Sequence, residues 1–411
     1  MKLHLSRSSE TIREASLQIT GSKSETNRLL ILQALYPNVQ IKNASKSDDS
    51  EVLQKALATS DTRINVHHAG TAMRFLTAYF SAKEGVEIEL TGSERMQQRP
   101  IGILVEALRT LGAEILYAKN KGFPPLKIKG KKLQNKRVTL KAGVSSQFIS
   151  ALLLIAPSLP NGLVLTLEGT ITSRPYIEMT LALLHQLGVS YHFIENTITV
   201  HHLSIVKKSG VTVESDWSSA SYFYSLVALS ENKKIQLKSY KSESLQGDSA
   251  LVQLYKTLGV QTIFDTKTHR IRLQKTTIEM PSIYKADLSN TPDIAQTIAV
   301  TCFGLGIGCE LTGLHTLKIK ETDRLLALKI ELEKLGAVVT ISEDSLSIKS
   351  SRTILPNIAI DTYNDHRMAM AFAPLALKTP IQINDAQVVS KSFPTFWEDM
   401  CTIGISVQNY S

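Results

Sequence analysis

Hydrophobic side chains recur at steps of three and four residues in several stretches of the chain, which is the spacing of one face of an α-helix. The stretch 318–337 has the clearest pattern, because Leu325, Leu328, Leu332 and Leu335 fall on the same face. Three further stretches end in the same way, with a leucine before a glycine at the expected helix C-terminal cap. The four glycines lie about 70 to 80 residues apart, at Gly112, Gly188, Gly259 and Gly336.

An alternating or apolar stretch follows each of these glycines and predicts a β-hairpin. The hairpins are expected within residues 113–130, 189–202, 260–274 and 337–350. A helix followed by a hairpin therefore recurs along the chain, and this regularity indicates a repeated structural unit.

A second class of helix is apolar almost all round, which predicts that these helices lie in the interior. Small and polar residues typical of helix N-caps stand near their starts. Six such starts indicate about three copies of the unit in each of two domains. The six stretches are residues 21–35, 69–80, 145–156, 216–229, 291–303 and 364–377.

Positive side chains stand where several of these helices begin, although a helix N-terminus itself carries partial positive charge. In the stretch 318–337 they are Lys318, Lys320 and Arg324. Either neighbouring acids such as Glu321 and Asp323 neutralise these cations, or an anion binds there. Cations recur early in three of the apolar helices, at Lys23 and Arg28, Arg74, and Arg367. We therefore expect the helix starts to converge on a substrate with several negative charges.

Composition narrows the class of protein and of partner. The chain has 411 residues, of which 43% are hydrophobic and 20% charged, and this suits two globular domains. Its net charge of +9 favours an acidic partner, either a nucleic acid or a phosphorylated or carboxylated small molecule. Nucleic-acid signatures are lacking, and the basic cluster within residues 127–137 is interpreted as a solvated loop or strand edge.

The cysteines and apolar segments give expectations about location. Cys302, Cys309 and Cys401 form no CxxC pair and suit a reducing cytosol. Residues 1–18 contain no apolar signal-peptide segment, and no apolar run is long enough to span a bilayer. We therefore predict a cytoplasmic protein without a membrane partner, and no residues have the spacing of a metal site.

Nine short segments occur in an order that closely resembles the EPSP synthase family, the 3-phosphoshikimate 1-carboxyvinyltransferases among the enolpyruvyl transferases. The resemblance extends from about residue 20 to about residue 400. Any one segment is a weak signal, since "GSKS" lacks the spacing of a P-loop, but nine in order are specific. The segments are "GSKSETNR", "AGTAMRFL", "RMQQRPIG", "SSQF", "SRPYIEMT", "TPDIAQT", "KIKETDRL", "YNDHRMAM" and "KSFPTFWED".

The resemblance implies an α/β fold with two domains. Each is an inside-out α/β barrel of three βαβαββ repeats, with buried helices and outer sheets. The chain is expected to begin in one domain, build the other and return. The expected bounds are 1–18 plus 215–411 for the phosphoenolpyruvate-side domain and 19–214 for the shikimate-3-phosphate-side domain.

The implied reaction transfers the enolpyruvyl group of phosphoenolpyruvate to the 5-hydroxyl of shikimate 3-phosphate. Phosphate leaves through a tetrahedral addition intermediate, as a step of the shikimate pathway toward chorismate and the aromatic amino acids. The family resemblance also implies inhibition by glyphosate, no cofactor and no metal. We further expect a monomer that binds no nucleic acid.

Binding roles carry over where the segments match. Lys23 resembles a lysine that contacts both substrates, and Gln147 resembles an amide near both. Residues implied for shikimate 3-phosphate are Ser24, Arg28, Ser145, Ser146, Ser173, Asp293, Thr316 and Lys320. Residues implied for phosphoenolpyruvate are Gly70, Arg99, Arg324, Arg367 and Lys391. Thr71 and Tyr176 are implied to bind substrate, without assignment to one of the two.

The implied catalytic residues are Lys23, Asp293, Glu321 and His366. Asp293 resembles the acceptor of the hydroxyl proton, and Glu321 an acid/base partner at the methylene carbon. Each has a simpler interpretation by itself, because Asp293 suits the first turn of a helix and Glu321 suits an ion pair with Lys320 or Arg324.

Two positions depart from the family pattern, and other functions remain as alternatives. His68 stands where an asparagine is common, and Thr316 stands where many members have an asparagine that contacts the shikimate part. The first alternative is the enolpyruvyl transferase that acts on UDP-N-acetylglucosamine, which typically uses a loop cysteine. A basic nucleic-acid-binding protein and an inactive relative with a binding role are the others.

Overall fold

The computed structural model describes residues 1–10, 12–143, 145–171, 174–207 and 210–409. The chain divides into two compact units, one of Met1–Thr20 with Glu214–Ser411 and one of Gly21–Val213. We call them unit 1 and unit 2. The expected bounds differ from these by one or two residues.

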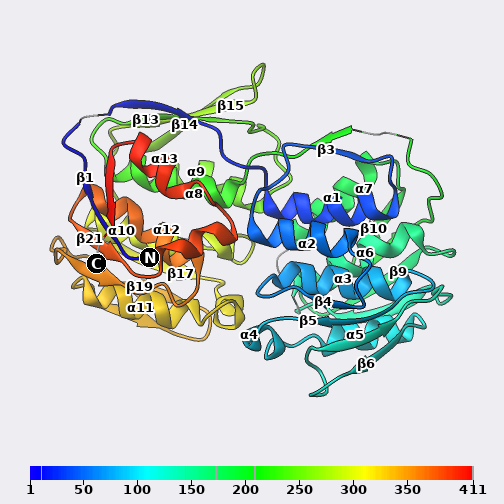
Figure 1. Ribbon diagram of the computed structural model, residues 1–411. Coiled ribbons are helices and arrows are strands. Elements are labelled where there is room, and N and C mark those ends of the chain that lie inside the picture. The colour runs from blue at the N-terminus through cyan, green and yellow to red at the C-terminus, as the bar shows by residue number, and fades with distance from the viewer. Residues whose placement is uncertain (11, 144, 172–173, 208–209, 410–411) are drawn as a thin grey trace. The chain divides into compact units, whose positions relative to one another are not determined.

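Unit 2 is built from helices covered by sheets (Figure 1). Its helices are α1 (Lys23–Leu35), α2 (Asp48–Ala58), α3 (Gly70–Ala82), α4 (Glu94–Gln97), α5 (Gly102–Thr110), α6 (Ser146–Ile155), η1 (Ala156–Ser158) and α7 (Arg174–Gln186). One sheet has the order β4 (Arg63–Asn65), β5 (Glu87–Thr91), β7 (Leu126–Lys129), β6 (Glu114–Tyr117). A second has the order β10 (Tyr191–Ile194), β11 (Thr197–Val200), β9 (Leu163–Glu168), β8 (Arg137–Lys141). The third pairs β12 (Gly210–Thr212) with β3 (Gln40–Lys42).

Unit 1 has three four-stranded sheets among its described residues. The first has the order β20 (Ile358–Ile360), β21 (Ile381–Ile383), β1 (Leu3–Arg7), β22 (Ile405–Asn409). The second has the order β14 (Val260–Asp265), β15 (Arg270–Lys275), β13 (Lys234–Lys238), β2 (Glu14–Leu17). The third has the order β16 (Ile283–Asp287), β17 (Gly308–Thr312), β19 (Leu346–Ile348), β18 (Val339–Ile341). The α-helices are α8 (Trp217–Leu229), α9 (Leu251–Lys256), α10 (Ala295–Leu305), α11 (Arg324–Lys334), α12 (His366–Phe372) and α13 (Phe396–Thr402). The 3-10 helices are η2 (Gly247–Ala250), η3 (Pro292–Ile294), η4 (His315–Ile319), η5 (Ala373–Leu377) and η6 (Ala386–Lys391).

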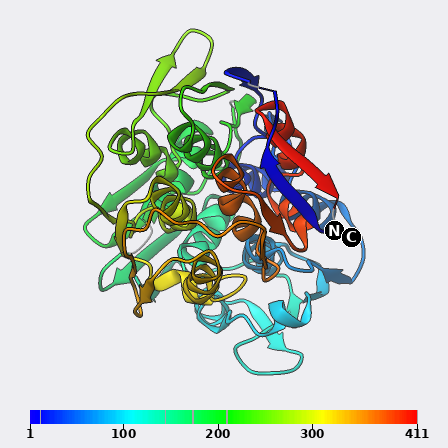
Figure 2. The same cartoon turned by 90° about the vertical axis from the view of Figure 1, so that its left-hand side faces the viewer.

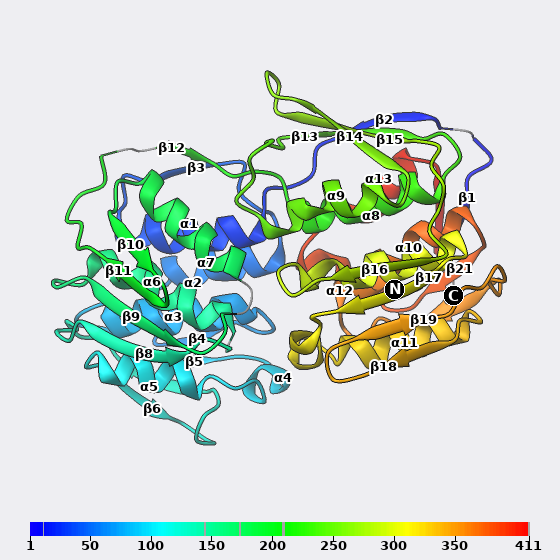
Figure 3. The ribbon, with the colours of Figure 1, turned by 180° about the vertical axis from the view of Figure 1, so that it is seen from behind.

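The repeated unit of the sequence is a βαβαββ motif. In one copy β4, α3, β5, α5, β6 and β7 follow along the chain, β4 pairs parallel with β5, and the hairpin of β6 and β7 joins antiparallel to β5. Strands β8 to β11 and β16 to β19 repeat this pairing with their own helices (Figure 3). All four predicted hairpins are present, and their preceding glycines have positive φ angles, as a helix cap of this kind requires.

Two features of the repeat differ from the expected pattern. The copy with β3 and β12 is a two-stranded sheet, because only residues 59–62 separate α2 from β4 and leave no room for a hairpin. In unit 1, β1 from the start of the chain lies between β21 and β22, so the first and last strands are neighbours (Figure 2). Strand β2 likewise completes the sheet of β13 to β15.

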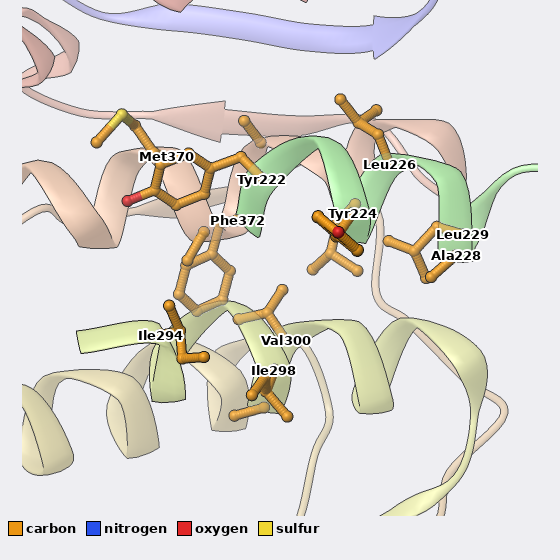
Figure 4. Close-up of a cluster of buried hydrophobic side chains, with 14 of the residues drawn as sticks. Tyr222, Tyr224, Leu226, Ala228, Leu229, Ile294, Ile298, Val300, Met370 and Phe372 are labelled. Carbon is orange, nitrogen blue, oxygen red and sulfur yellow. The ribbon is translucent and has the colours of Figure 1, made fainter. Parts of the chain in front are cut away.

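The central helices are buried and the strands have one covered face, as predicted. Along β7, Leu126 and Ile128 are buried while Lys127 and Lys129 are exposed, which is the alternation of a sheet with one wet face. In unit 1, α10 packs on both α8 and α12. Tyr222 of α8 and other large side chains of these helices gather there in a hydrophobic cluster (Figure 4). Within the described part of the chain, no helix is long and apolar enough to cross a membrane.

Candidate functional site

Unit 2 gathers the starts of several helices around polar side chains. Lys23 is the first residue of α1, and its Nζ lies 3.6 Å from Oδ2 of Asp49 in the first turn of α2. The other oxygen of Asp49, Oδ1, lies 3.8 Å from Nε2 of His68, just before α3. Asp49 therefore lies between Lys23 and His68, and His68 is one of the two positions that depart from the family pattern.

A second set of contacts joins α3 to α6. Thr71 accepts a hydrogen bond of 3.1 Å from Nε2 of Gln147, in the first turn of α6. Ser145 caps α6 by accepting the N–H of Gln147. At Gly70 an added Cβ would overlap Nη1 of Arg99 and lie 3.0 Å from its Cζ. Glycine is therefore what allows the Arg99 guanidinium to approach the start of α3.

Arg28 is buried beneath this surface rather than open to solvent. Its Nε donates to Thr180 Oγ1 at 2.7 Å, and its Nη2 donates to Ser150 Oγ at 2.9 Å. Its remaining described bonds go to the backbone carbonyls of Ser24 and Tyr176. Burial lowers the pKa of Arg28 to about 10, so the group is still cationic at neutral pH. These donors hold α1, α6 and α7 together.

Three further residues of unit 2 were singled out from the sequence, namely Arg74, Ser146 and Ser173. Arg74, one of the early cations, is buried and donates to the carbonyls of Gly70 and Pro100, so it supports the local backbone. Ser146 is the first residue of α6. Ser173 lies outside the described residues.

In unit 1, Asp293 lies among three cations from separate elements. Its Oδ1 accepts from Nη1 of Arg324 at 3.0 Å and lies 3.5 Å from Nζ of Lys320. Its Oδ2 accepts from Nη2 of Arg367 at 3.1 Å, and its backbone carbonyl accepts from Nη1 of the same arginine at 2.9 Å. These residues meet in the fold although they are 27 to 74 positions from Asp293 in the sequence.

Arg324 is enclosed by carboxylates. Its side chain is 2% exposed; Nε donates to Asp365 at 2.6 Å and Nη2 donates to Glu321 at 2.8 Å. Burial alone would lower the pKa of Arg324, but the carboxylates of Asp365, Glu321 and Asp293 outweigh burial and raise it above its ordinary value. Three carboxylates thus neutralise much of the local positive charge, which was one of the two explanations open for the sequence.

The start of α11 differs from the prediction of a helix beginning near Lys318. Lys318 lies in η4, and α11 begins only at Arg324. Asp323 sets this start, because its side chain caps the helix by accepting the N–H of Leu326 at 3.1 Å. Lys318 pairs instead with Glu343 at 2.8 Å, so it is no part of the Asp293 cluster.

The remaining candidates of unit 1 lie around this cluster. His366 is buried in α12, with Nδ1 3.8 Å from Oδ1 of Asp365. Lys391, at the end of η6, donates to the backbone carbonyl of Asn364 at 2.6 Å. Thr316 lies in η4, and its buried hydroxyl has no hydrogen-bond partner among the described residues.

Asp49 and Asp365 were not among the residues predicted from the sequence. Asp365 directly precedes His366 and Arg367 and is the N-cap of α12, so its place in the sequence was a usable signal. Asp49 has only the ordinary signal of an acid in a first helical turn. Among the described residues, no group of three or more His, Cys, Asp and Glu side chains could hold a metal ion.

Known proteins resemble this chain over most of its length. A 3-phosphoshikimate 1-carboxyvinyltransferase of Bacteroides fragilis is 45% identical over 399 residues, which cover 96% of each chain. One of Colwellia psychrerythraea is 35% identical over 416 residues, covering 94% of this chain and 96% of its own.

Solved structures share the fold. EPSP synthase from Acinetobacter baumannii matches with a TM-score of 0.78 at 21% identity, and the enolpyruvyl transferase NikO from Streptomyces tendae matches with 0.74 at 12% identity. Each match covers 100% of both chains. The family model of EPSP synthase (3-phosphoshikimate 1-carboxyvinyltransferase) matches residues 50–400. With these matches on top of the ordered segments, the chain belongs to the EPSP synthase family.

Proposed function

We propose that this chain transfers the enolpyruvyl group of phosphoenolpyruvate to the 5-hydroxyl of shikimate 3-phosphate and releases phosphate. The observation that carries the proposal is the Asp293 cluster, found in a chain of this family. The Asp293 carboxylate is there surrounded by Lys320, Arg324 and Arg367. Glu321 also forms an ion pair with Arg324. Such a cluster places cationic side chains that can bind an anionic substrate next to two carboxyl groups that can transfer protons.

In the proposed addition step, the 5-hydroxyl oxygen attacks C2 of phosphoenolpyruvate while C3 gains a proton. Asp293 accepts the hydroxyl proton, and Glu321 serves as the acid at C3. In the elimination step the C2–O bond to phosphate breaks, C3 loses a proton, and the double bond forms again. Arg324 and Arg367 compensate the charge of the phosphoenolpyruvate phosphate and carboxylate, and Lys391 joins them as a ligand.

Unit 2 supplies the other proposed contacts. Lys23 contacts both substrates, and the helix starts that carry Ser145 and Ser146 suit the phosphate of shikimate 3-phosphate, since backbone N–H groups at such starts favour anions. Gly70 and Arg99 serve phosphoenolpyruvate, and the close approach of the Arg99 guanidinium to Gly70 supports that pairing.

The cysteines favour shikimate 3-phosphate over UDP-N-acetylglucosamine as the acceptor. Cys302 lies in α10 and Cys309 in β17, both buried, and Cys401 lies in α13. All three therefore belong to regular elements, and none lies in a loop like the one from which the UDP-N-acetylglucosamine enzyme typically presents its cysteine.

The test is phosphate release by the purified chain. Phosphate is expected only when phosphoenolpyruvate and shikimate 3-phosphate are present together, with each omitted in turn as a control. Release of phosphate with UDP-N-acetylglucosamine in place of shikimate 3-phosphate would assign the chain to the rival acceptor.

A further inference from the structure

We propose that Asp248 is a positioning residue for enolpyruvyl transfer: acting through Ser218, it fixes the Arg367 guanidinium beside Asp293, and its charge competes with the anionic substrate for that guanidinium. This inference rests on the proposed function. Asp248 lies in η2, a segment outside the nine that resemble the family, and nothing in the proposed mechanism uses it.

The connection is a chain of hydrogen bonds within unit 1. The Ser218 hydroxyl, in the first turn of α8, donates to Oδ2 of Asp248. Ser218 Oγ in turn accepts from Nη2 of Arg367 at 3.4 Å, and the same nitrogen donates to Oδ2 of Asp293 at 3.1 Å. The guanidinium is thus held from two sides, by Asp293 on one and by Ser218 with Asp248 on the other.

Asp248 is buried, and one of its carboxyl oxygens has no hydrogen-bond partner among the described residues. The residue is 4% exposed, and the oxygen in question is Oδ1. A buried carboxyl group with one unpaired oxygen is unfavourable for folding by itself. We attribute the presence of this unfavourable group next to Ser218 and Arg367 to a role in the reaction.

Ionisation of Asp248 adds the competing charge. Burial raises the pKa of Asp248 to about 7, and the negative charge of Asp293 acts in the same direction. The charged groups that face it are Asp216 at the start of α8, Asp293 of η3 and Arg367 of α12. Below this pH the neutral acid still accepts from Ser218, whereas above it the carboxylate also attracts Arg367.

Two consequences follow for pH dependence. As the pH rises through about 7, Arg367 becomes less available to phosphoenolpyruvate, so the KM for that substrate rises. Stability changes as well: because the folded-state pKa of Asp248 is raised, its ionisation destabilises the fold increasingly from the unfolded-state pKa of about 4 up to about 7. Neither consequence exists once the group cannot ionise.

The experiment compares the wild type with Asp248→Asn, Ser218→Ala and the double variant. Asparagine keeps an acceptor for Ser218 but has no charge, whereas alanine at 218 breaks the connection and leaves the acid. The matched control is Asp399→Asn in α13, since Asp399 also has a pKa raised by burial and accepts a hydroxyl, that of Thr395, at 3.2 Å. Steady-state kinetics and thermal unfolding are measured at about pH 6, 7 and 8, with unfolding extended down to about pH 4.

Ser218→Ala is expected to raise the KM for phosphoenolpyruvate about tenfold, because a hydrogen bond that orients a charged group is lost, and to leave the KM for shikimate 3-phosphate within about twofold. Asp248→Asn is expected to match wild type at pH 6 and to have the lower KM for phosphoenolpyruvate at pH 8. The ratio of the variant's KM to the wild-type KM at each pH cancels the effect of the ionisation of phosphoenolpyruvate itself. The double variant should resemble Ser218→Ala at pH 6, where Asp248 is mostly neutral, and should have a lower KM than Ser218→Ala at pH 8, because the charge of Asp248 acts on Arg367 without Ser218.

The unfolding data are expected to show Asp248→Asn gaining stability over wild type from pH 4 to 7 and no further above it. Equal KM values for phosphoenolpyruvate in wild type, Ser218→Ala and Asp248→Asn at every pH would overturn the proposal. If wild type releases no phosphate at all, the proposed function fails instead. The unfolding curves of the single and double variants would then still show whether the effects of the Asp248 and Ser218 substitutions on stability are coupled.

Discussion

Replacing Arg324 by methionine should destabilise unit 1 far more than the loss of an ordinary ion pair. Arg324 is 2% exposed, and its guanidinium donates to Asp365, Asp293 and Glu321. Asp365 is itself fully buried, at 0% exposed, so the variant would leave its carboxylate without the charge that now compensates it. Methionine fills a similar volume, and the loss is therefore electrostatic rather than a cavity.

The expected size follows from burial. Breaking a buried pair by removing one partner costs about 3–5 kcal/mol, because the remaining charge stays desolvated. The control is Lys285→Met, whose partner Glu310 lies at 2.7 Å but whose pair is 68% and 43% exposed. A surface pair of this kind contributes about 0–1 kcal/mol. The two variants each remove one cation from unit 1 and differ mainly in the burial of the charge that is left.

Urea unfolding followed by tryptophan fluorescence measures this difference in unit 1 alone. Both tryptophans of the chain, Trp217 and Trp397, belong to unit 1. With a typical dependence of about 2 kcal/mol per molar urea, Arg324→Met should lower the transition midpoint by about 2 M. The gap from wild type should narrow in acid, where protonation removes the uncompensated charges. A midpoint within about 0.5 M of Lys285→Met would refute the idea that the carboxylates depend on Arg324.

The remaining predictions concern the reaction. Gly70→Ala should change thermal stability little, since Arg99 can turn aside, but should raise the KM for phosphoenolpyruvate and weaken glyphosate inhibition; unchanged values of both would contradict the contact. Glu321→Gln and Asp293→Asn should each lower kcat by about 10²–10⁴-fold while shikimate 3-phosphate still binds in calorimetry. Near-normal turnover in either variant would mean that the residue only supports its cationic neighbours. Chelators should leave the rate unchanged, and a rate restored only by added metal would refute metal-independent catalysis.

Local patterns in the sequence predicted much of the fold. The periodic leucines, the glycine caps and the alternating stretches identified the helices and hairpins, because these depend on residues close together in the chain. The short sheet of β3 and β12 was not foreseen, since the length of one connection decides it. The insertion of β1 between β21 and β22 was likewise hidden, because it joins segments more than 370 residues apart.

Candidate site residues were predictable by type and family order, but not their partners. Asp293, Arg324 and Arg367 were all predicted as site residues, but the sequence did not show that Asp365, 41 positions from Arg324, would accept a hydrogen bond from it. The start of α11 was predicted too early, because Asp323 caps the helix by accepting the N–H of Leu326 and α11 therefore begins only at Arg324. Such pairings depend on how several elements pack, which local periodicity does not encode.

The central claim is addition followed by elimination at C2 of phosphoenolpyruvate, and an NMR experiment in D2O tests it most directly. If C3 gains a proton in the addition and loses one in the elimination, a methyl group exists in between and exchanges one hydrogen for deuterium. The account predicts an enolpyruvyl ether of shikimate 3-phosphate with deuterium in its methylene group, formed together with inorganic phosphate. An ether with no deuterium, or phosphate released without any ether, would contradict it.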